Sequence, residues 1–231
     1  NRSTSRTRFD FEKIILDPIP GCIRVELVDW DRDGRLDITA LFTQERECLQ
    51  IYLTRPNGFE RRTIWQGRDL GFGTVGMELV DLDGDGDLDI LIANGDAFDN
   101  NFANPSHGLQ WIENLGGLRF ESHRLLDLPG AYGVTGADFD GDGDIDILLV
   151  ANLPASVKPL ELRDSKTASI VLLENDGEQT FTPRVLSISP PRYATVISGD
   201  FDGNGTIDFA VGGLEFSPAN NIPKLEFWLN L

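Results

Sequence analysis

Four acidic nine-residue segments recur along the chain: DWDRDGRLD at 29–37, DLDGDGDLD at 81–89, DFDGDGDID at 138–146 and DFDGNGTID at 200–208. Each segment has oxygen-bearing side chains at positions 1, 3, 5 and 9, and glycine at position 6. Ca²⁺ prefers roughly six to eight oxygen ligands, and glycine permits the sharp turn that brings alternate side chains together. The pattern therefore predicts a chain that folds around about four calcium ions, one in each acidic loop.

We expect the side chains at positions 1, 3, 5 and 9 to bind the ion, and position 7 to contribute its backbone carbonyl. The expected metal-site residues are Asp29, Asp31, Asp33, Arg35 and Asp37; Asp81, Asp83, Asp85, Asp87 and Asp89; Asp138, Asp140, Asp142, Asp144 and Asp146; and Asp200, Asp202, Asn204, Thr206 and Asp208. The alternative is a set of solvated acidic turns without metal. Carboxylates ~4 Å apart repel by about 4 kcal/mol per pair at an effective dielectric near 20, which favours a bound cation.

The first and last loops depart from the common pattern. Arg32 and Arg35 bring positive charge into the first loop, which weakens the case for a metal there. Asn204 and Thr206 leave the last loop with three carboxylates. We therefore expect the last loop to bind calcium more weakly than the two central loops.

These loops differ from the EF-hand loop, which needs a bidentate glutamate at position 12 and helices on both sides. Position 12 is occupied here by Ala40, Ile92, Leu149 and Val211. The runs LDITALF, LDILIAN, IDILLVAN and IDFAVGG follow the loops, and such short apolar runs indicate buried strands. Dockerin-type loops, which also lead into helices, are excluded for the same reason.

The loops begin 52, 57 and 62 residues apart, a spacing typical of propeller-like arrays. Each period contains four strand-like runs joined by short turns. We predict first strands at 23–29, 75–81, 132–138 and 194–200, second strands directly after the loops, third strands at 48–54, 109–115, 169–175 and 225–231, and fourth strands at 59–65, 119–126 and 181–187.

The last period lacks a fourth strand, and FDFEKIILD at 9–17 resembles RFESHRLLDL at 119–128. We therefore predict an all-β, single-domain β-propeller of four four-stranded antiparallel blades, in which the N-terminal strand closes the last blade. The repeats cover about 9–58, 59–118, 119–180 and 181–231 of the domain 1–231. Closure removes the exposed edges of an open sheet. The alternative is four blades of a larger seven- or eight-bladed ring, completed by further sequence or by a second copy.

The chain resembles the FG-GAP/VCBS repeat family, the calcium-loop β-propellers best known from integrin α-subunits. The resemblance is carried by Gly71-Phe72-Gly73, by the four acidic loops and by the aliphatic run after each loop. Its sequence pattern is most similar to that of bacterial extracellular VCBS-repeat proteins. The resemblance implies a propeller with one calcium ion per loop and an interaction function, whereas fold alone does not fix function.

Charge and composition limit the partners. The net charge is −18, and four Ca²⁺ ions would still leave −10, which argues against nucleic acid or an anionic membrane as partner. No apolar run reaches the roughly 18 residues of a membrane-spanning helix, so we expect no membrane insertion. Weak carboxylate sites fill in extracellular calcium, so we expect an extracellular or periplasmic location. Cys22 and Cys48 leave a disulfide and two free thiols as open alternatives.

The long connections 95–107, 153–168 and 213–224 are expected at the end of the propeller opposite the acidic loops. Long structured loops on a rigid scaffold often bind partners. A protein or glycan is therefore expected there, with Asp96, Asp99, Asn100, His107 and Tyr132 as candidate contacts, although such residues also cap turns. Self-association of the chain is a further possibility.

The sequence predicts a calcium-stabilised binding or structural module rather than an enzyme. A carbohydrate-binding lectin is the first alternative. A calcium-dependent polysaccharide lyase using His107 and Tyr132 is the less favoured one, because no nucleophile or zinc arrangement has recognisable spacing.

Overall fold

The computed structural model describes residues 9–44, 46–163, 167–214 and 225–231, which form four antiparallel β-sheets. The first sheet contains β1 (Cys22–Val28), β2 (Asp37–Phe42), β3 (Cys48–Arg55) and β4 (Gly58–Gln66); the second contains β5 (Thr74–Val80), β6 (Asp89–Asn94), β7 (Gly108–Asn114) and β8 (Phe120–Asp127); the third contains β9 (Ala131–Ala137), β10 (Asp146–Ala151), β11 (Ala168–Asn175) and β12 (Phe181–Ile188); the fourth contains β13 (Tyr193–Gly199), β14 (Asp208–Gly213) and β15 (Leu225–Trp228). One short 3₁₀ helix, η1 (Leu160–Arg163), interrupts the strands. The predicted all-β architecture of antiparallel blades is confirmed.

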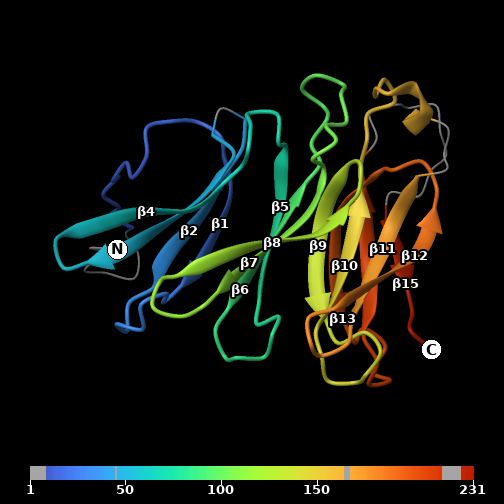
Figure 1. Ribbon diagram of the computed structural model, residues 1–231. Helices are drawn as coiled ribbons and strands as arrows, with labels where there is room; N and C mark the ends of the chain where they lie inside the picture. The colour runs from blue at the N-terminus through green and yellow to red at the C-terminus, as the bar shows by residue number, and fades with distance from the viewer. Residues whose placement is uncertain (1–8, 45, 164–166, 215–224) are drawn as a thin grey trace.

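The sheets stand side by side like the blades of a propeller, with β1–β4 at one end of the array and β13–β15 at the other (Figure 1). The first strands of neighbouring sheets pack against one another, β5 on β9 and β9 on β13. Three apolar clusters fill the junctions between successive sheets. The core is therefore a series of layers between blades.

The second strand of each inner sheet is buried on both faces. Ile90 and Ile92 of β6 join the cluster shared with the first sheet, whereas Leu91 and Ala93 join the cluster shared with the third. Successive side chains of a strand point to opposite faces, so a strand between two neighbours needs apolar residues throughout. This explains the uninterrupted aliphatic runs after the loops.

One element of the predicted closure is not formed. Residues 9–17 form no strand, and the fourth sheet has three strands among the described residues. Leu16 instead packs on Ala40, Phe42, Cys48 and Tyr52 of the first sheet. The Asp17 carboxylate accepts hydrogen bonds from Arg46 (2.6 Å), Arg61 (3.2 Å) and Tyr52 (3.2 Å). These contacts hold the segment on the first sheet, at the opposite end of the array from β15, so the predicted four-bladed closure is corrected to an open array.

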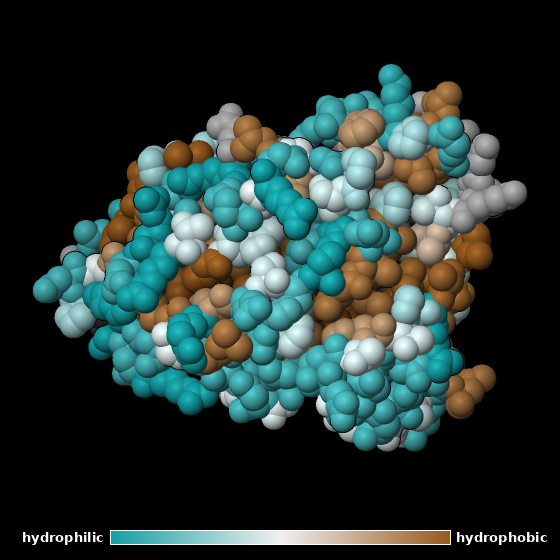
Figure 2. Space-filling model, viewed as in Figure 1, coloured by the Kyte–Doolittle hydropathy of each residue, from teal (hydrophilic) through white to brown (hydrophobic). Residues whose placement is uncertain are grey.

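The two kinds of connection lie at opposite ends of the blades. Figure 1 shows the turns 81–89 and 138–146 at the lower end, and the connections 95–107 and 153–163 at the upper end. The lower end is strongly hydrophilic in Figure 2. Most of the predicted loop 213–224 lies outside the described residues.

The two cysteines are free thiols, with Cys22 exposed and Cys48 buried. No helix among the residues described has the length and apolar character needed to cross a membrane.

Candidate functional site

The acidic segments form the turns between the first and second strands of the four sheets. In each turn, three carboxylates offer oxygens that all lie within 4.8 Å of one another. The four groups are Asp29, Asp31 and Asp33; Asp81, Asp83 and Asp85; Asp138, Asp140 and Asp146; and Asp200, Asp202 and Asp208. The structure thus brings together the side chains of positions 1 and 3 with that of position 5 or 9, as the spacing predicts.

Glycine at position 6 allows this convergence. Gly34, Gly86, Gly143 and Gly205 have φ values of 87°, 89°, 101° and 90°. This left-handed region is unfavourable for residues with a Cβ atom. The turn there lets the backbone N–H of each glycine donate to the position-1 aspartate, at 2.8–3.1 Å.

The aspartate at position 9 fastens each turn to its own sheet, and its side chain is buried in every repeat. One oxygen accepts a hydrogen bond from the backbone N–H of position 2, and the other accepts from the backbone near the end of the third strand. These bonds measure 2.7–3.2 Å and join Asp37 to Trp30 and Thr54, Asp89 to Leu82 and Asn114, Asp146 to Phe139 and Asn175, and Asp208 to Phe201 and Asn230. The fold itself therefore requires an acid at this position.

The donor set fits a hard divalent cation. Asp31 Oδ1 and Asp81 Oδ1 are buried, and neither has a hydrogen-bond partner in the described part of the chain. A buried polar atom without a partner is destabilising unless something satisfies it. Burial raises the pKa of Asp83 above its usual value, and the nearby Asp85 carboxylate raises it further. A cation with oxygen ligands such as Ca²⁺ would relieve both features.

The first loop carries its own positive charges. Arg55, from β3, places Nη1 2.5 Å from Asp31 Oδ2 and 3.5 Å from Asp33 Oδ2. Arg35 also pairs with Asp33. Arg32 and Arg35 were predicted from the sequence to bring positive charge into this loop, but Arg55 was not. Arg55 lies 18 residues beyond the end of the loop, and the pairing of β2 with β3 places it next to the loop.

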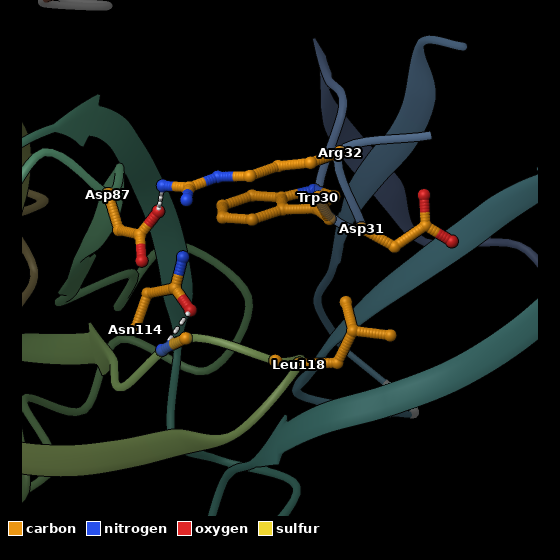
Figure 3. Close-up of a pocket in the computed structure, with 8 residues that line it drawn as sticks. Trp30, Asp31, Arg32, Asp87, Asn114 and Leu118 are labelled. Carbon is orange, nitrogen blue, oxygen red and sulfur yellow. Dashed lines mark hydrogen bonds and ion pairs between the residues drawn. The ribbon is translucent and has the colours of Figure 1, made fainter. Parts of the chain in front are cut away.

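Arg32 belongs instead to the junction between the first and second sheets. Figure 3 shows its guanidinium reaching past Trp30 to pair with Asp87, at position 7 of the second loop. These residues line a pocket of about 360 Å³ together with Asn114 and Leu118.

Position 7 lies outside the carboxylate groups in all four described loops. Asp87 pairs with Arg32, and the Thr206 hydroxyl lies 2.6 Å from both Asn204 Oδ1 and the Asn230 carbonyl, so that its one proton is donated to one of the two. Arg35 pairs with Asp33, and Asp144 lies beside Gly177. Because these side chains contact other partners outside the carboxylate groups, their placement agrees with position 7 offering its backbone carbonyl, and not its side chain, to a cation.

At the opposite end, four of the five candidate contacts lie on the loop 95–107, and the fifth, Tyr132, lies near Asp96. Phe98 and Tyr132 meet edge to face, with ring centroids 6.2 Å apart. Burial raises the pKa of Tyr132, and the nearby carboxylate of Asp96 raises it further. Asp96 and Asn100 accept hydrogen bonds from their own loop backbone, whereas Asp99 accepts one from Gln44 in the connection between β2 and β3.

His107 is placed differently from the prediction. Its side chain is buried, and its two ring nitrogens face the backbone N–H groups of Asn104 (3.3 Å) and Gly130 (3.4 Å). Burial, together with the nearby Arg124 charge, lowers its pKa to about 4. His107 therefore supports the loop from within, and ligand contact by its imidazole is not supported.

Two of the long connections pack on each other. Ala97 and Ala103 form a small apolar cluster with Leu153, Val157 and Leu162. The backbone of Lys158 bonds to Asn101 and Ala103, at 2.8 Å each. This contact is not predictable from the sequence, because neither loop has a strand-like or helical period.

The family model described as FG-GAP-like repeat matches residues 29–92. This range begins at the first acidic loop and runs through the second loop to β6. No curated protein matches the chain. Residues 29–92 therefore carry an FG-GAP-like repeat, and the recurrence of its loop and strands in the later sheets is consistent with the FG-GAP/VCBS-like repeat family that the sequence resembles.

Proposed function

We propose that the chain is a calcium-stabilised, propeller-type module, extracellular or periplasmic, that binds a protein or glycan partner or serves as a structural unit. One observation carries the calcium proposal above all others. The same carboxylate group recurs in four sheets, and Asp31 and Asp81 each keep a buried oxygen without a partner among the described residues. FG-GAP-like repeats are typical of non-enzymatic binding or structural modules, which agrees with this role.

Bound Ca²⁺ would supply positive charge that offsets the repulsion between the clustered carboxylates. The side chains at positions 1 and 3 would hold it in every loop, joined by position 5 or 9. Because these turns connect the two inner strands of each blade, the ions would stiffen one end of the array. Sites of this kind fill at extracellular calcium concentrations, which supports an extracellular or periplasmic location.

Thermal unfolding, followed by circular dichroism with excess Ca²⁺ or with a chelator, tests the proposal. A ligand that binds only the native state stabilises it by about 2.7 kcal/mol per site at 100 times its Kd. We expect the chelator to lower Tm strongly and Ca²⁺ to restore it, whereas Mg²⁺ at the same concentration restores less, because Mg²⁺ demands a tighter octahedral shell. An unchanged Tm under chelation would contradict calcium binding.

A matched pair of variants locates the ions. Asp83→Asn removes a carboxylate from the second loop's group, so the calcium-induced rise in Tm should shrink. Asp87→Asn is the control, because its side chain pairs with Arg32 and lies outside that group. If both variants lose the same part of the calcium response, the assignment of side chains to the ion is wrong.

A glycan is the second candidate partner, favoured by the Phe98–Tyr132 pair beside Asp96. Aromatic faces stack on sugar rings, and carboxylates accept hydrogen bonds from sugar hydroxyls. A glycan array with the calcium-loaded chain tests this, with Tyr132→Ala expected to lose binding and Asp176→Ala, on an exposed turn of the third sheet, expected to keep it. Binding to no glycan would leave a protein partner as the remaining proposal.

A polysaccharide lyase is disfavoured by the chemistry of the same residues. His107 lies in the interior with its ring nitrogens facing backbone groups. The pKa of Tyr132 is raised, whereas a catalytic tyrosine base needs a lowered one. We expect no unsaturated product from acidic polysaccharides, with or without calcium.

A further inference from the structure

The two ends of the array expose positions that the inner sheets bury. Val25, Met77 and Val134 occupy the same place in their repeats, four residues before the first loop aspartate. Each lies opposite a second-strand residue on the face turned toward the preceding blade. Met77 and Val134 are 8% and 5% exposed, whereas Val25, which no preceding blade covers among the described residues, is 56% exposed.

The last sheet shows the complementary pattern on its other face. Ile51, Trp111 and Phe227 are equivalent third-strand residues, paired with the second residue after the position-9 aspartate. Ile51 and Trp111 are buried against the next blade, at 0% and 5% exposure, whereas Phe227 is 53% exposed. Ile197 and Leu225 on the same sheet are also exposed. The chain thus carries both halves of a blade–blade junction, one at each end.

The strand pattern is complementary in the same way. In the first three sheets, the third strand pairs with a fourth, but β15 has no fourth strand beside it among the described residues. Residues 9–17 form no strand and lie on the first sheet, through Leu16 and Asp17. Leu126, at the same place in the repeat, packs into the junction between the second and third sheets. An unpaired strand edge of this kind readily accepts another strand.

The connection that follows residues 9–17 also has the geometry of a blade-to-blade link. The Gly21 carbonyl accepts a hydrogen bond from Thr43 N at 2.9 Å. Gly73 and Gly130, which lead from the first to the second and from the second to the third sheet, accept equivalent bonds at 2.8 Å. Residues 9–17 therefore lie where the outermost strand of a preceding blade would lie.

We propose that a second copy of this chain occupies both ends, so that two chains form one closed ring of eight blades. The blade-four end of each copy packs on the blade-one end of the other, and β15 of one copy pairs with residues 9–17 of its partner. Closure within one chain would require all three packed junctions to bend, and close-packed interiors resist such deformation. Two copies reach eight blades, at the upper end of the usual range of about 4–8, whereas three copies would exceed it.

Sedimentation equilibrium in excess Ca²⁺ gives the first test. We expect a species of twice the 25.6 kDa chain mass at micromolar concentration. A monomer at every concentration would overturn the proposal. An open series of larger species would also overturn it, because a head-to-tail contact that fails to close gives filaments.

Charge substitutions then separate this ring from other dimers. Val25→Glu and Phe227→Glu each destroy one end face and should each give a monomer with the circular dichroism and Tm of a folded chain, because both residues are exposed in a single copy. Mixing the two variants should restore a heterodimer, since one intact junction remains. A dimer that persists in either variant alone would show a face-to-itself contact and overturn the proposal. Val185→Glu, 51% exposed on β12 and away from the ends, is the control that should stay dimeric.

Hydrogen exchange tests the strand pairing. The amides of 9–17 should exchange at least tenfold more slowly in the dimer than in the monomeric Val25→Glu variant. Equal exchange in the two would overturn the proposed pairing with β15.

Discussion

At the level of single residues, the loop aspartates divide into two roles. Asp146 accepts backbone hydrogen bonds with both oxygens, at 3.0 Å from Phe139 and 2.9 Å from Asn175. Both belong to the third loop's carboxylate group, but Asp140 accepts one bond among the described residues, from Asp142 within its own turn. The two residues look equivalent in the sequence, but only one is part of the fold without metal.

Asp146→Asn and Asp140→Asn should separate these roles. An amide nitrogen cannot accept from a backbone N–H, so Asp146→Asn should lower the unfolding free energy by about 1–3 kcal/mol even in chelator. Asp140→Asn should be neutral or stabilising in chelator, because it removes a repelling charge, and destabilising in Ca²⁺. Urea denaturation in both conditions measures this, and a metal-independent loss in Asp140→Asn would contradict the division.

Asp17 offers a pH-dependent test of the N-terminal segment. Burial acts to raise its pKa, but hydrogen bonds from Ile19, Arg46 and Tyr52 outweigh burial and lower the pKa to about 2. A carboxyl with a lowered pKa stabilises the fold above its unfolded value of 3.8, and the stabilisation is lost as pH falls toward about 2. Asp17→Asn should therefore lower Tm at neutral pH and cost less as pH falls below that value. A difference in Tm independent of pH would show that the ion pairs contribute nothing.

At the level of elements, the first acidic loop differs from the other three because an arginine of a neighbouring strand, Arg55, contacts its carboxylates. Arg55 reaches from β3 to Asp31 and Asp33 and supplies positive charge to these carboxylates. Arg55→Met should raise calcium affinity at this loop roughly tenfold, because a cation ~5 Å from a divalent ion repels it by over 1 kcal/mol even in water. The same variant should be less stable than the wild type in chelator. Calorimetric titration measures the affinity, and Arg62→Met is the control, because within the described part of the chain Arg62 pairs with Glu60 and not with a loop aspartate.

The strands were predictable because their cause is local. Every described strand begins within one residue of its predicted start. Strand starts depend on the hydrophobic pattern and on glycine-rich turns, and both can be recognised from residues that are neighbours in the sequence. Residues 9–17 were predicted to form a strand from the same local pattern. A strand also needs a hydrogen-bonding partner, and whether β15 lies close enough to pair with residues 9–17 depends on how all four sheets are arranged. Arg55, His107 and the packing of Val157 on Ala97 were missed because each depends on contacts distant in sequence.

At the level of the whole molecule, the charge of −18 is unevenly placed, with nearly half of the 38 acidic residues in the four loops at one end. Self-repulsion of this kind destabilises a compact state and is screened by salt, with a Debye length of about 10 Å at 0.1 M. Added NaCl should therefore raise Tm markedly in chelator and only slightly in Ca²⁺. Equal salt effects in the two conditions would show that the ions do not neutralise this end.

The position-9 aspartates have a consequence for the duplication of single repeats. Because Asp37, Asp89, Asp146 and Asp208 each tie a turn to a strand of the same sheet, every repeat brings its own internal fastening when its coding segment is duplicated. At the opposite end, the connections between the second and third strands differ in length from sheet to sheet, whereas the acidic turns keep the same length and the same hydrogen bonds.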